Sequence, residues 1–258
     1  MISVILSALR NLPFIVWLLA QLRRLRVFRR NIAVYRASGN DESERGEILK
    51  ATSVWGDDIV RKLRVDLRAE GETALPDGPA VFVSNHESYA DIPLFCSVVK
   101  NKQFGFVAKQ NLSRIPVFGK WIADIRSVFI ERDDLRASLK SIDDGVALLH
   151  RGFSLVVFPE GTRGRGAPMG AFKKGSLRLA TKPGLPVVPV THSGCFRIFE
   201  ESGVIKKNKR VRFFVHPPIE TAHMSKHEAA ALTETVENII RSKLSEWAAE
   251  EKERENGV

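Results

Sequence analysis

Cysteine is scarce in this chain of 258 residues, since only Cys96 and Cys195 occur and they do not form a Cys-x-x-Cys pair. This excludes the paired-cysteine motifs of zinc and thiol redox sites and indicates a reducing compartment. His223 and His227 stand one helical turn apart, but no obvious third ligand accompanies them. A solvated helix start explains them more simply than a metal site does.

Several functional signatures are also missing. There is no Gly-x-Ser-x-Gly elbow, which disfavours a nucleophilic serine hydrolase, and no Gly-Lys-Ser/Thr ending of a Walker loop. No helix-turn-helix, zinc finger or aromatic RNA-binding signature supports a nucleic-acid partner. Acidic residues are outnumbered, with 30 Asp and Glu against 40 Lys and Arg, giving a net charge of +10. The surface is therefore expected to attract phosphates, including those of lipid head groups.

The amino terminus lacks an uninterrupted hydrophobic run. Residues 2–20 are mostly apolar and about long enough to cross a bilayer, but Arg10, Asn11 and Pro13 lie in the middle. The segment fits a spanning helix, two short apolar halves in one leaflet, or a helix buried on its own domain. Five arginines between residues 23 and 30 suit an anionic leaflet. We expect residues 1–36 to form a membrane-associated helical segment, on the cytoplasmic face.

The polar stretch 37–47 is predicted to be a linker or an exposed turn, followed by one α/β domain over residues 48–258. In that domain short β-rich apolar runs alternate with helical patterns, which predicts a central sheet, mostly parallel or mixed, flanked by helices. The predicted strands are Val65–Arg68, Ala80–Ser84, Phe104–Ala108, Ser127–Ile130, Leu155–Phe158, Val187–Val190 and Val211–Val215.

His86 comes just after the run Ala80–Ser84, at the carboxyl end of a predicted strand, where open α/β sheets place their ligands. Asp91 can reach it only if the chain turns between them, since five residues along one helix would separate the two side chains by roughly 140°. A carboxylate on one imidazole nitrogen leaves the other free to act as a base. The alternative is that Ser88 and Asp91 merely cap a helix. Without a nucleophile, the pair would deprotonate a hydroxyl that attacks an activated acyl group.

A second candidate site is the loop Pro159–Gly166, which follows the predicted strand Leu155–Phe158. Its glycines allow close approach of the backbone to a ligand, and Arg163 offers a planar fork for a phosphate. Lys109 adds a cation at the end of another predicted strand. A flexible surface turn and a solvated lysine are the simpler interpretations of these features.

Four ordered blocks resemble those of the 1-acyl-sn-glycerol-3-phosphate acyltransferases, a family of glycerolipid acyltransferases. Order and spacing agree over about residues 65–195. The blocks are Asn85–Asp91 (Asn-His-x-x-x-x-Asp), Lys109–Gly119 running on to Phe129–Arg132, Phe158–Arg163 (Phe-Pro-Glu-Gly-Thr-Arg) and Val188–Val190.

The resemblance implies that His86 is a general base oriented by Asp91. His86 would remove the proton from the sn-2 hydroxyl of lysophosphatidic acid, which attacks an acyl thioester to give phosphatidic acid in phospholipid biosynthesis. Acyl-CoA or acyl-carrier protein would be the co-substrate, and no metal or tightly bound cofactor is implied. The substrate-binding residues implied in this way are Asn85, Lys109, Glu160, Gly161, Thr162 and Arg163.

Two positions depart from the family pattern. Arg126 stands where a small residue, often glycine, is expected, and Gly164 replaces a common serine. Both are expected beside the phosphate site, so the acceptor could be another lysolipid, such as a lyso-aminolipid, or glycerol phosphate. A non-catalytic basic membrane-binding protein is the alternative from a different class.

Overall fold

Seven strands form a central sheet in the computed structural model, which describes residues 2–71, 75–131 and 134–255. They are β1 (Asp66–Glu70), β2 (Val81–Ser84), β3 (Phe104–Lys109), β4 (Val128–Ile130), β5 (Ser154–Val157), β6 (Val187–Ser193) and β7 (Arg210–Val215). The strand order is β1-β7-β6-β2-β5-β3-β4, and every neighbouring pair is parallel except β6 with β7. The predicted α/β fold and all seven predicted strands are confirmed; Arg132 of the second block lies outside the described residues.

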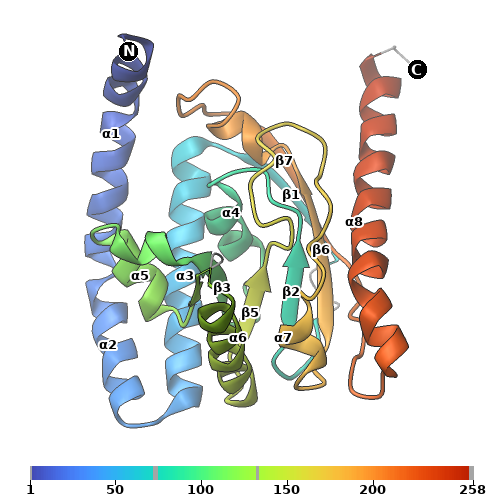
Figure 1. Ribbon diagram of the computed structural model, residues 1–258. Helices are drawn as coiled ribbons and strands as arrows, with labels where there is room; N and C mark the ends of the chain where they lie inside the picture. The colour runs from blue at the N-terminus through green and yellow to red at the C-terminus, as the bar shows by residue number, and fades with distance from the viewer. Residues whose placement is uncertain (1, 72–74, 132–133, 256–258) are drawn as a thin grey trace.

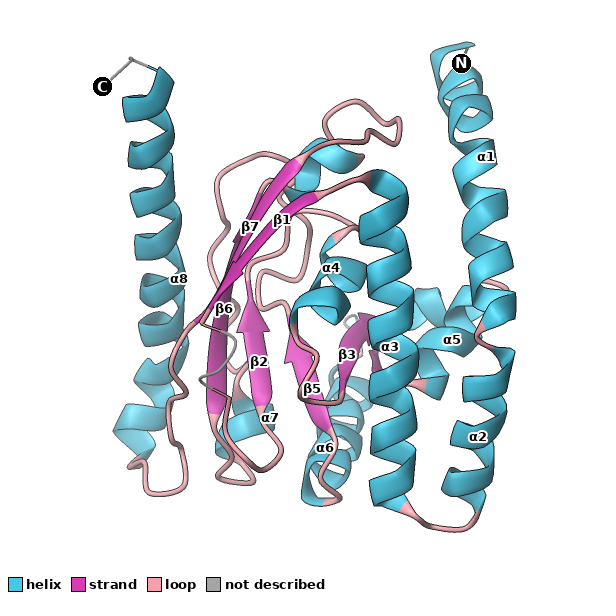
Figure 2. Ribbon diagram, turned by 180° about the vertical axis from the view of Figure 1, so that it is seen from behind, coloured by secondary structure: helices cyan, strands magenta, loops and turns pink. Residues whose placement is uncertain are grey.

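Helices cover both faces of this sheet (Figures 1 and 2). The main ones are α3 (Asp41–Leu63) and α4 (Asp91–Val98) on one face, and α6 (Leu135–His150), α7 (Arg178–Thr181) and α8 (Lys226–Glu255) on the other. Successive side chains of a strand point to opposite faces, so one strand serves two cores. On β2, Phe82 packs in the core of the α3 and α4 face, whereas Val81 and Val83 pack in the core of the α6 and α8 face. This double burial explains why the central strands are continuous apolar runs.

Short helical segments complete the chain. They are η1 (Gln110–Arg114), α5 (Phe118–Asp124) and η2 (Cys195–Ile198). The helix α6 begins where Asp134 accepts hydrogen bonds from the backbone N–H groups of Arg136 and Ala137. Neither α7 nor η2 is predicted from the sequence, because segments of four residues carry too little periodicity.

The amino terminus forms two successive helices, α1 (Ile2–Arg24) and α2 (Arg26–Ala37). Pro13 lies inside α1, so the interpretation of residues 2–20 as two separate halves is wrong. Asn11 is buried because its side chain binds the loop before β7, donating to Gly203 O at 2.9 Å and accepting from Ile205 N at 2.8 Å. Over the described residues, none of the helices has the length and apolarity needed to cross a membrane.

The predicted linker over residues 37–47 is shorter than expected. Only residues 38–40 are non-helical, and α3 then runs antiparallel to α2, as both figures show. Asn40 caps α3 by accepting a hydrogen bond from Ser43 N at 3.0 Å. Glu44, within the expected linker, is buried against Arg36 and Arg126. The predicted exposed turn is present only at residues 38–40, and the rest of the stretch is helical, with Glu44 and Glu47 buried against partners inside the fold.

Candidate active site

The candidate site lies where β2, β5 and β6 end side by side. His86 follows β2 by two residues, Glu160 follows β5 by three, and His192 is the penultimate residue of β6. Because these strands are neighbours and parallel, their carboxyl ends meet at one edge of the sheet. The sheet therefore brings together segments that are up to about a hundred residues apart in the chain.

His86 and Asp91 meet as the sequence predicts. The chain turns after β2, and His86 Nδ1 lies 2.6 Å from Asp91 Oδ2. The same oxygen accepts hydrogen bonds from the backbone N–H groups of Glu87 and Ser88, at 2.8 and 3.0 Å. Asp91 is fully buried, whereas the side chain of His86 is 18% exposed. The imidazole is thus fixed on its Nδ1 side and open on its other side.

Asp91 takes part in a capping box with Ser88, as the alternative predicts, because its Oδ2 accepts from Ser88 N. It does not merely cap the helix, since the same oxygen also contacts His86, so the two interpretations are compatible. Asp91 is the first residue of α4, and the preceding Ala90 makes no side-chain cap. The hydroxyl of Ser88 accepts from Ala90 N at 2.9 Å, while the carboxylate of Asp91 turns back to the loop before the helix. Asp91 therefore orders the loop that carries His86.

The loop after β5 closes over the His86 loop. Glu160 Oε1 accepts from His86 N at 2.7 Å, and Glu160 Oε2 accepts from Gly170 N at 2.8 Å. Gly164 N donates to His86 O at 2.7 Å, and the ring of Phe158 stacks on that of His86 with centroids 4.1 Å apart. Burial raises the pKa of Glu160. The two predicted constellations thus form one structure around His86.

Other predicted substrate-binding residues have varied surroundings. Asn85 is buried, and its amide clamps the backbone of His192 by accepting from N at 3.0 Å and donating to O at 2.8 Å. Gly161 adopts a φ of +73°, a conformation that favours glycine, and Thr162 is exposed. Lys109 is exposed at the end of β3, which β5 separates from β2. Roles of these residues in binding substrate stay predictions.

Arg163 lies beside this site and is already paired. Its Nη1 donates to Glu200 Oε1 at 2.8 Å, and its Cζ lies 3.4 Å from the centroid of the Tyr89 ring. Glu200 Oε1 also accepts from Tyr89 N at 3.0 Å. The cation predicted to bind phosphate is therefore held between Tyr89 on the loop after β2 and Glu200 on the segment after η2.

The structure adds a residue that the sequence did not single out. His192 is fully buried, and its Nε2 lies 3.2 Å from Asp91 Oδ1. Burial alone would lower the pKa of His192, but the Asp91 carboxylate raises it. Burial alone would raise the pKa of Asp91, but His192 and His86 hold it well below its usual range. The available signal was the position of His192 just after the fourth block, at the same sheet edge as His86.

One group of possible metal ligands occurs among the described residues. Donor atoms of Glu87, His192 and Cys195 lie within 4.8 Å of one another. Burial raises the pKa of Glu87 to about 7 and the pKa of Cys195 well above its usual value. A metal binds the deprotonated forms of these groups, so binding at this cluster would have to release the protons of Glu87 and Cys195.

The two departures from the family pattern lie in different places. Gly164 is at the site, through its hydrogen bond to His86 O. Arg126 precedes β4, at the opposite end of the sheet, and pairs with both carboxylate oxygens of Glu44 at 2.7 Å. The prediction that Arg126 lies beside the phosphate site is therefore wrong. Its φ of 63° is in the left-handed region, which explains why glycine suits this position.

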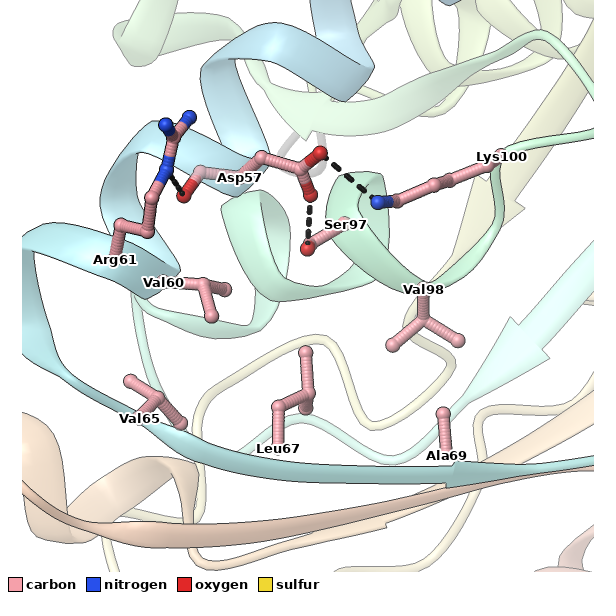
Figure 3. Close-up of a pocket in the computed structure, with 9 residues that line it drawn as sticks. All are labelled: Asp57, Val60, Arg61, Val65, Leu67, Ala69, Ser97, Val98 and Lys100. Atoms are coloured by element: carbon pink, nitrogen blue, oxygen red, sulfur yellow. Dashed lines mark hydrogen bonds and ion pairs between the residues drawn. The ribbon is translucent and has the colours of Figure 1, made fainter.

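A cavity of about 760 Å³ opens elsewhere, between α3, α4 and β1 (Figure 3). Its apolar lining includes Val60, Leu67 and Val98, and Asp57 at its rim binds Ser97 and Lys100. Ser97 and Val98, which line the cavity, are at the carboxyl end of α4, whereas Asp91 is at its start. The cavity is thus separate from the His86 site.

Comparisons with known proteins agree with this arrangement. Residues 66–193 match the Acyltransferase family model. The chain is 36% identical over 183 residues to a chloroplast 1-acyl-sn-glycerol-3-phosphate acyltransferase of Arabidopsis thaliana, covering 70% of this chain and 48% of that protein. It is 30% identical over 164 residues to a 1-acyl-sn-glycerol-3-phosphate acyltransferase of Borreliella burgdorferi, covering 64% of this chain and 65% of that protein. The chain thus spans between about half and two thirds of these two relatives.

A solved structure matches nearly the whole fold. It is the 1-acyl-sn-glycerophosphate (LPA) acyltransferase PlsC from Thermotoga maritima, with a TM-score of 0.71 and 27% identity. The match covers 94% of this chain and 98% of that one. The helices at both ends of the chain are therefore largely included in the similarity.

Proposed function

Because the chain belongs to the 1-acyl-sn-glycerol-3-phosphate acyltransferase family of glycerolipid acyltransferases, we propose that it acylates the sn-2 hydroxyl of lysophosphatidic acid. The acyl donor is a thioester, either acyl-CoA or acyl-carrier protein, and the product is phosphatidic acid. The names of the relatives describe the same acceptor class. The proposal extends that activity to this chain.

The observation that carries the proposal is the 2.6 Å contact between His86 Nδ1 and Asp91 Oδ2. It fixes the proton on Nδ1 and leaves Nε2 as the base. In the proposed reaction His86 Nε2 takes the hydroxyl proton as the acceptor oxygen forms a bond to the thioester carbonyl carbon. The tetrahedral intermediate then expels the thiolate, which recovers the proton from His86. No covalent acyl-enzyme is needed.

We assign the acceptor phosphate to Arg163. Its guanidinium offers two parallel N–H groups to phosphate oxygens, and Glu200 together with the ring of Tyr89 holds it in place. Lys109 supplies a further positive charge at the same edge of the sheet. This assignment gives the loop after β5 two tasks, since Glu160 of that loop also fixes the backbone of His86.

Membrane association is proposed for α1 and α2. Asn11 holds α1 on the body of the protein, and apolar side chains elsewhere on these helices are exposed. They are Leu9, Leu12, Ile15, Val16, Leu19, Val27 and Val34, with the exposed basic residues Arg10, Arg23, Arg26 and Arg30. Apolar side chains flanked by arginines suit insertion at the surface of an anionic bilayer. A surface location would bring the site to its lipid acceptor.

The test is an assay of the purified full chain in detergent micelles. Lysophosphatidic acid is supplied with acyl-CoA or with acyl-carrier protein, and free thiol and diacyl product are measured together. We expect equal amounts of thiol and phosphatidic acid. Parallel reactions with glycerol 3-phosphate and with a lyso-aminolipid define the acceptor. If only glycerol 3-phosphate or only the lyso-aminolipid is acylated, that compound is the acceptor in place of lysophosphatidic acid. If no acceptor is acylated, the proposed enzymatic function is wrong.

A further inference from the structure

Both carboxylate oxygens of Asp91 have close polar neighbours, but only Oδ2 belongs to the pair with His86. Oδ2 accepts from His86 and from the loop backbone, whereas Oδ1 faces His192 Nε2 at 3.2 Å. In the described part of the chain neither Oδ1 nor His192 Nε2 makes a hydrogen bond of regular geometry, so the 3.2 Å approach between them is a contact of opposite charges when His192 is protonated. The carboxylate therefore lies between two imidazoles, one partly open and one sealed in the core.

We propose that His192 is a positioning residue, which pairs with Asp91 Oδ1 and thereby aims the imidazole of His86. The effects on kcat expected below rest on the proposed acyltransferase function. It does not make His192 a catalytic residue, because the side chain is fully buried and cannot touch a substrate.

His192 is itself held from several sides. Its Nδ1 lies 3.1 Å from the Ser84 hydroxyl, and its ring stacks on Phe213 with centroids 5.1 Å apart. The amide of Asn85, the residue directly before His86, binds both the N–H and the C=O of His192. β6 thus supports the catalytic loop through a backbone clamp and through an imidazole.

The charges around His192 suit a proton on Nε2. Asp91 faces it from α4, Glu87 from the His86 loop and Cys195 from η2, and Glu160 on the loop after β5 also acts on it. The Asp91 carboxylate raises the pKa of His192 against the effect of burial, while burial raises the pKa values of Glu87 and Cys195. A proton on His192 therefore offsets the buried negative charge of Asp91 and opposes its rotation away from His86.

Two substitutions separate positioning from packing. His192→Leu fills the space without a donor, whereas His192→Gln places an amide N–H near the former Nε2. We expect His192→Leu to lower kcat roughly tenfold to a hundredfold, with both KM values unchanged, and His192→Gln to recover most of the loss. Unchanged kcat in His192→Leu, or equal losses in both variants, would overturn the proposal. Zinc bound stoichiometrically to the purified chain would also overturn it, since the cluster would then be a metal site.

An independent measurement does not require turnover. The short bond from His86 Nδ1 to Asp91 should give a low-field imidazole proton resonance in protein labelled with ¹⁵N-histidine, assigned by its loss in His86→Ala. We expect His192→Leu to shift or abolish this resonance and His192→Gln to keep it; an unchanged resonance in His192→Leu contradicts the proposal. If the wild type shows no turnover, the proposed function fails, and the resonance still decides the role of His192.

A milder variant covers the case in which His192→Leu does not fold. Ser84→Ala leaves His192 in place but removes the hydroxyl beside Nδ1. We expect it to lower kcat a few-fold at unchanged KM and to broaden or shift the same resonance. Wild-type kcat together with a wild-type resonance would overturn the proposal.

Discussion

The guanidinium of Arg163 lies over the ring of Tyr89, with 3.4 Å between Cζ and the ring centroid. Glu200 accepts from the same guanidinium at 2.8 Å and is almost completely buried. The cation is therefore ordered before any acceptor arrives, which reduces the entropy lost when a phosphate binds.

Replacing Arg163 by alanine should raise the KM for lysophosphatidic acid roughly tenfold or more and change kcat little. A charge-assisted hydrogen bond to the phosphate is lost, while His86 and Asp91 are untouched. Steady-state kinetics at varied acceptor concentration measures the effect. Arg197→Ala is the matched control, since Arg197 pairs with Glu251 instead of Glu200. An unchanged KM in Arg163→Ala would remove Arg163 from the phosphate site.

The same substitution leaves the carboxylate of Glu200 buried without its cation, which is destabilising. We expect Arg163→Ala to lower Tm and the double variant Arg163→Ala, Glu200→Gln to recover much of the loss. The KM should stay high in the double variant. If both Tm and KM returned to the wild-type values in the double variant, the KM effect of Arg163→Ala would come from misfolding of the loop after β5.

His86→Ala should lower kcat by roughly a hundredfold to ten-thousandfold, the usual contribution of a general base. The fold should remain, because the ring of His86 is at the edge of the core. Activity and thermal unfolding are measured side by side. His150→Ala provides the control, since His150 is exposed at the end of α6. Normal turnover in His86→Ala would refute the assignment of the base.

The double substitution Leu12→Asp, Val16→Asp should weaken binding to anionic vesicles at least tenfold. Both side chains are exposed on α1 and lie one helical turn apart on the same face. The substitutions therefore remove two apolar side chains that would be buried together in the bilayer. Co-sedimentation with vesicles of phosphatidylglycerol and phosphatidylcholine measures binding. Leu139→Asp is the control, because Leu139 is exposed on α6 instead. Equal sedimentation of all three proteins would place the membrane contact elsewhere.

Glu87→Gln should change how stability depends on pH. Burial raises the pKa of Glu87 from 4.5 to about 7, so between these values the folded chain keeps a proton that the unfolded chain has lost. The wild type therefore loses stability, on the order of 3 kcal/mol, as pH rises from about 4.5 to 7, and the loss remains above pH 7. Urea unfolding of both proteins across this range should show Glu87→Gln gaining relative to the wild type. Glu220→Gln is the control, because Glu220 is exposed. A difference in the free energy of unfolding between Glu87→Gln and the wild type that does not change with pH would contradict the prediction.

Arg126 permits a test of backbone strain. Arg126→Ala and Arg126→Gly both remove the ion pair with buried Glu44, so both should lower the free energy of unfolding by about 2–4 kcal/mol. Since the φ of residue 126 is 63°, the glycine variant should be about 1 kcal/mol more stable than the alanine variant. Equilibrium unfolding measures both differences, and an alanine variant as stable as the glycine variant would show that the backbone is not strained.

The strands and the His86–Asp91 pair could be predicted from the sequence because both depend on local patterns. Short apolar runs rich in β-branched residues identify the buried strands, and the spacing of five residues requires a turn. Strand order is not local, since each buried run has similar periodicity. His192 was missed for this reason: it contacts Asp91 only because β6 lies beside β2.

Polar residues within apolar segments were harder to interpret. Asn11 looked like an interruption of the amino-terminal run, but it binds the backbone of Gly203 and Ile205 without breaking α1. Arg126 was placed beside the phosphate site through the family resemblance, although it directly precedes the strand that follows and so lies at the end of the sheet opposite His86. Both residues have long-range partners, which composition and spacing do not specify.

The hydrogen bonds from the loop after β5 to the backbone of His86 have a consequence for protein engineering. Because Glu160 and Gly164 bind the N–H and C=O of His86, this loop cannot be exchanged as a module without moving the base. Libraries that seek a new acceptor should keep these two positions fixed and vary Arg163 and its neighbours on the segment after η2. Selectivity could then be redesigned while the alignment of the reacting groups is retained.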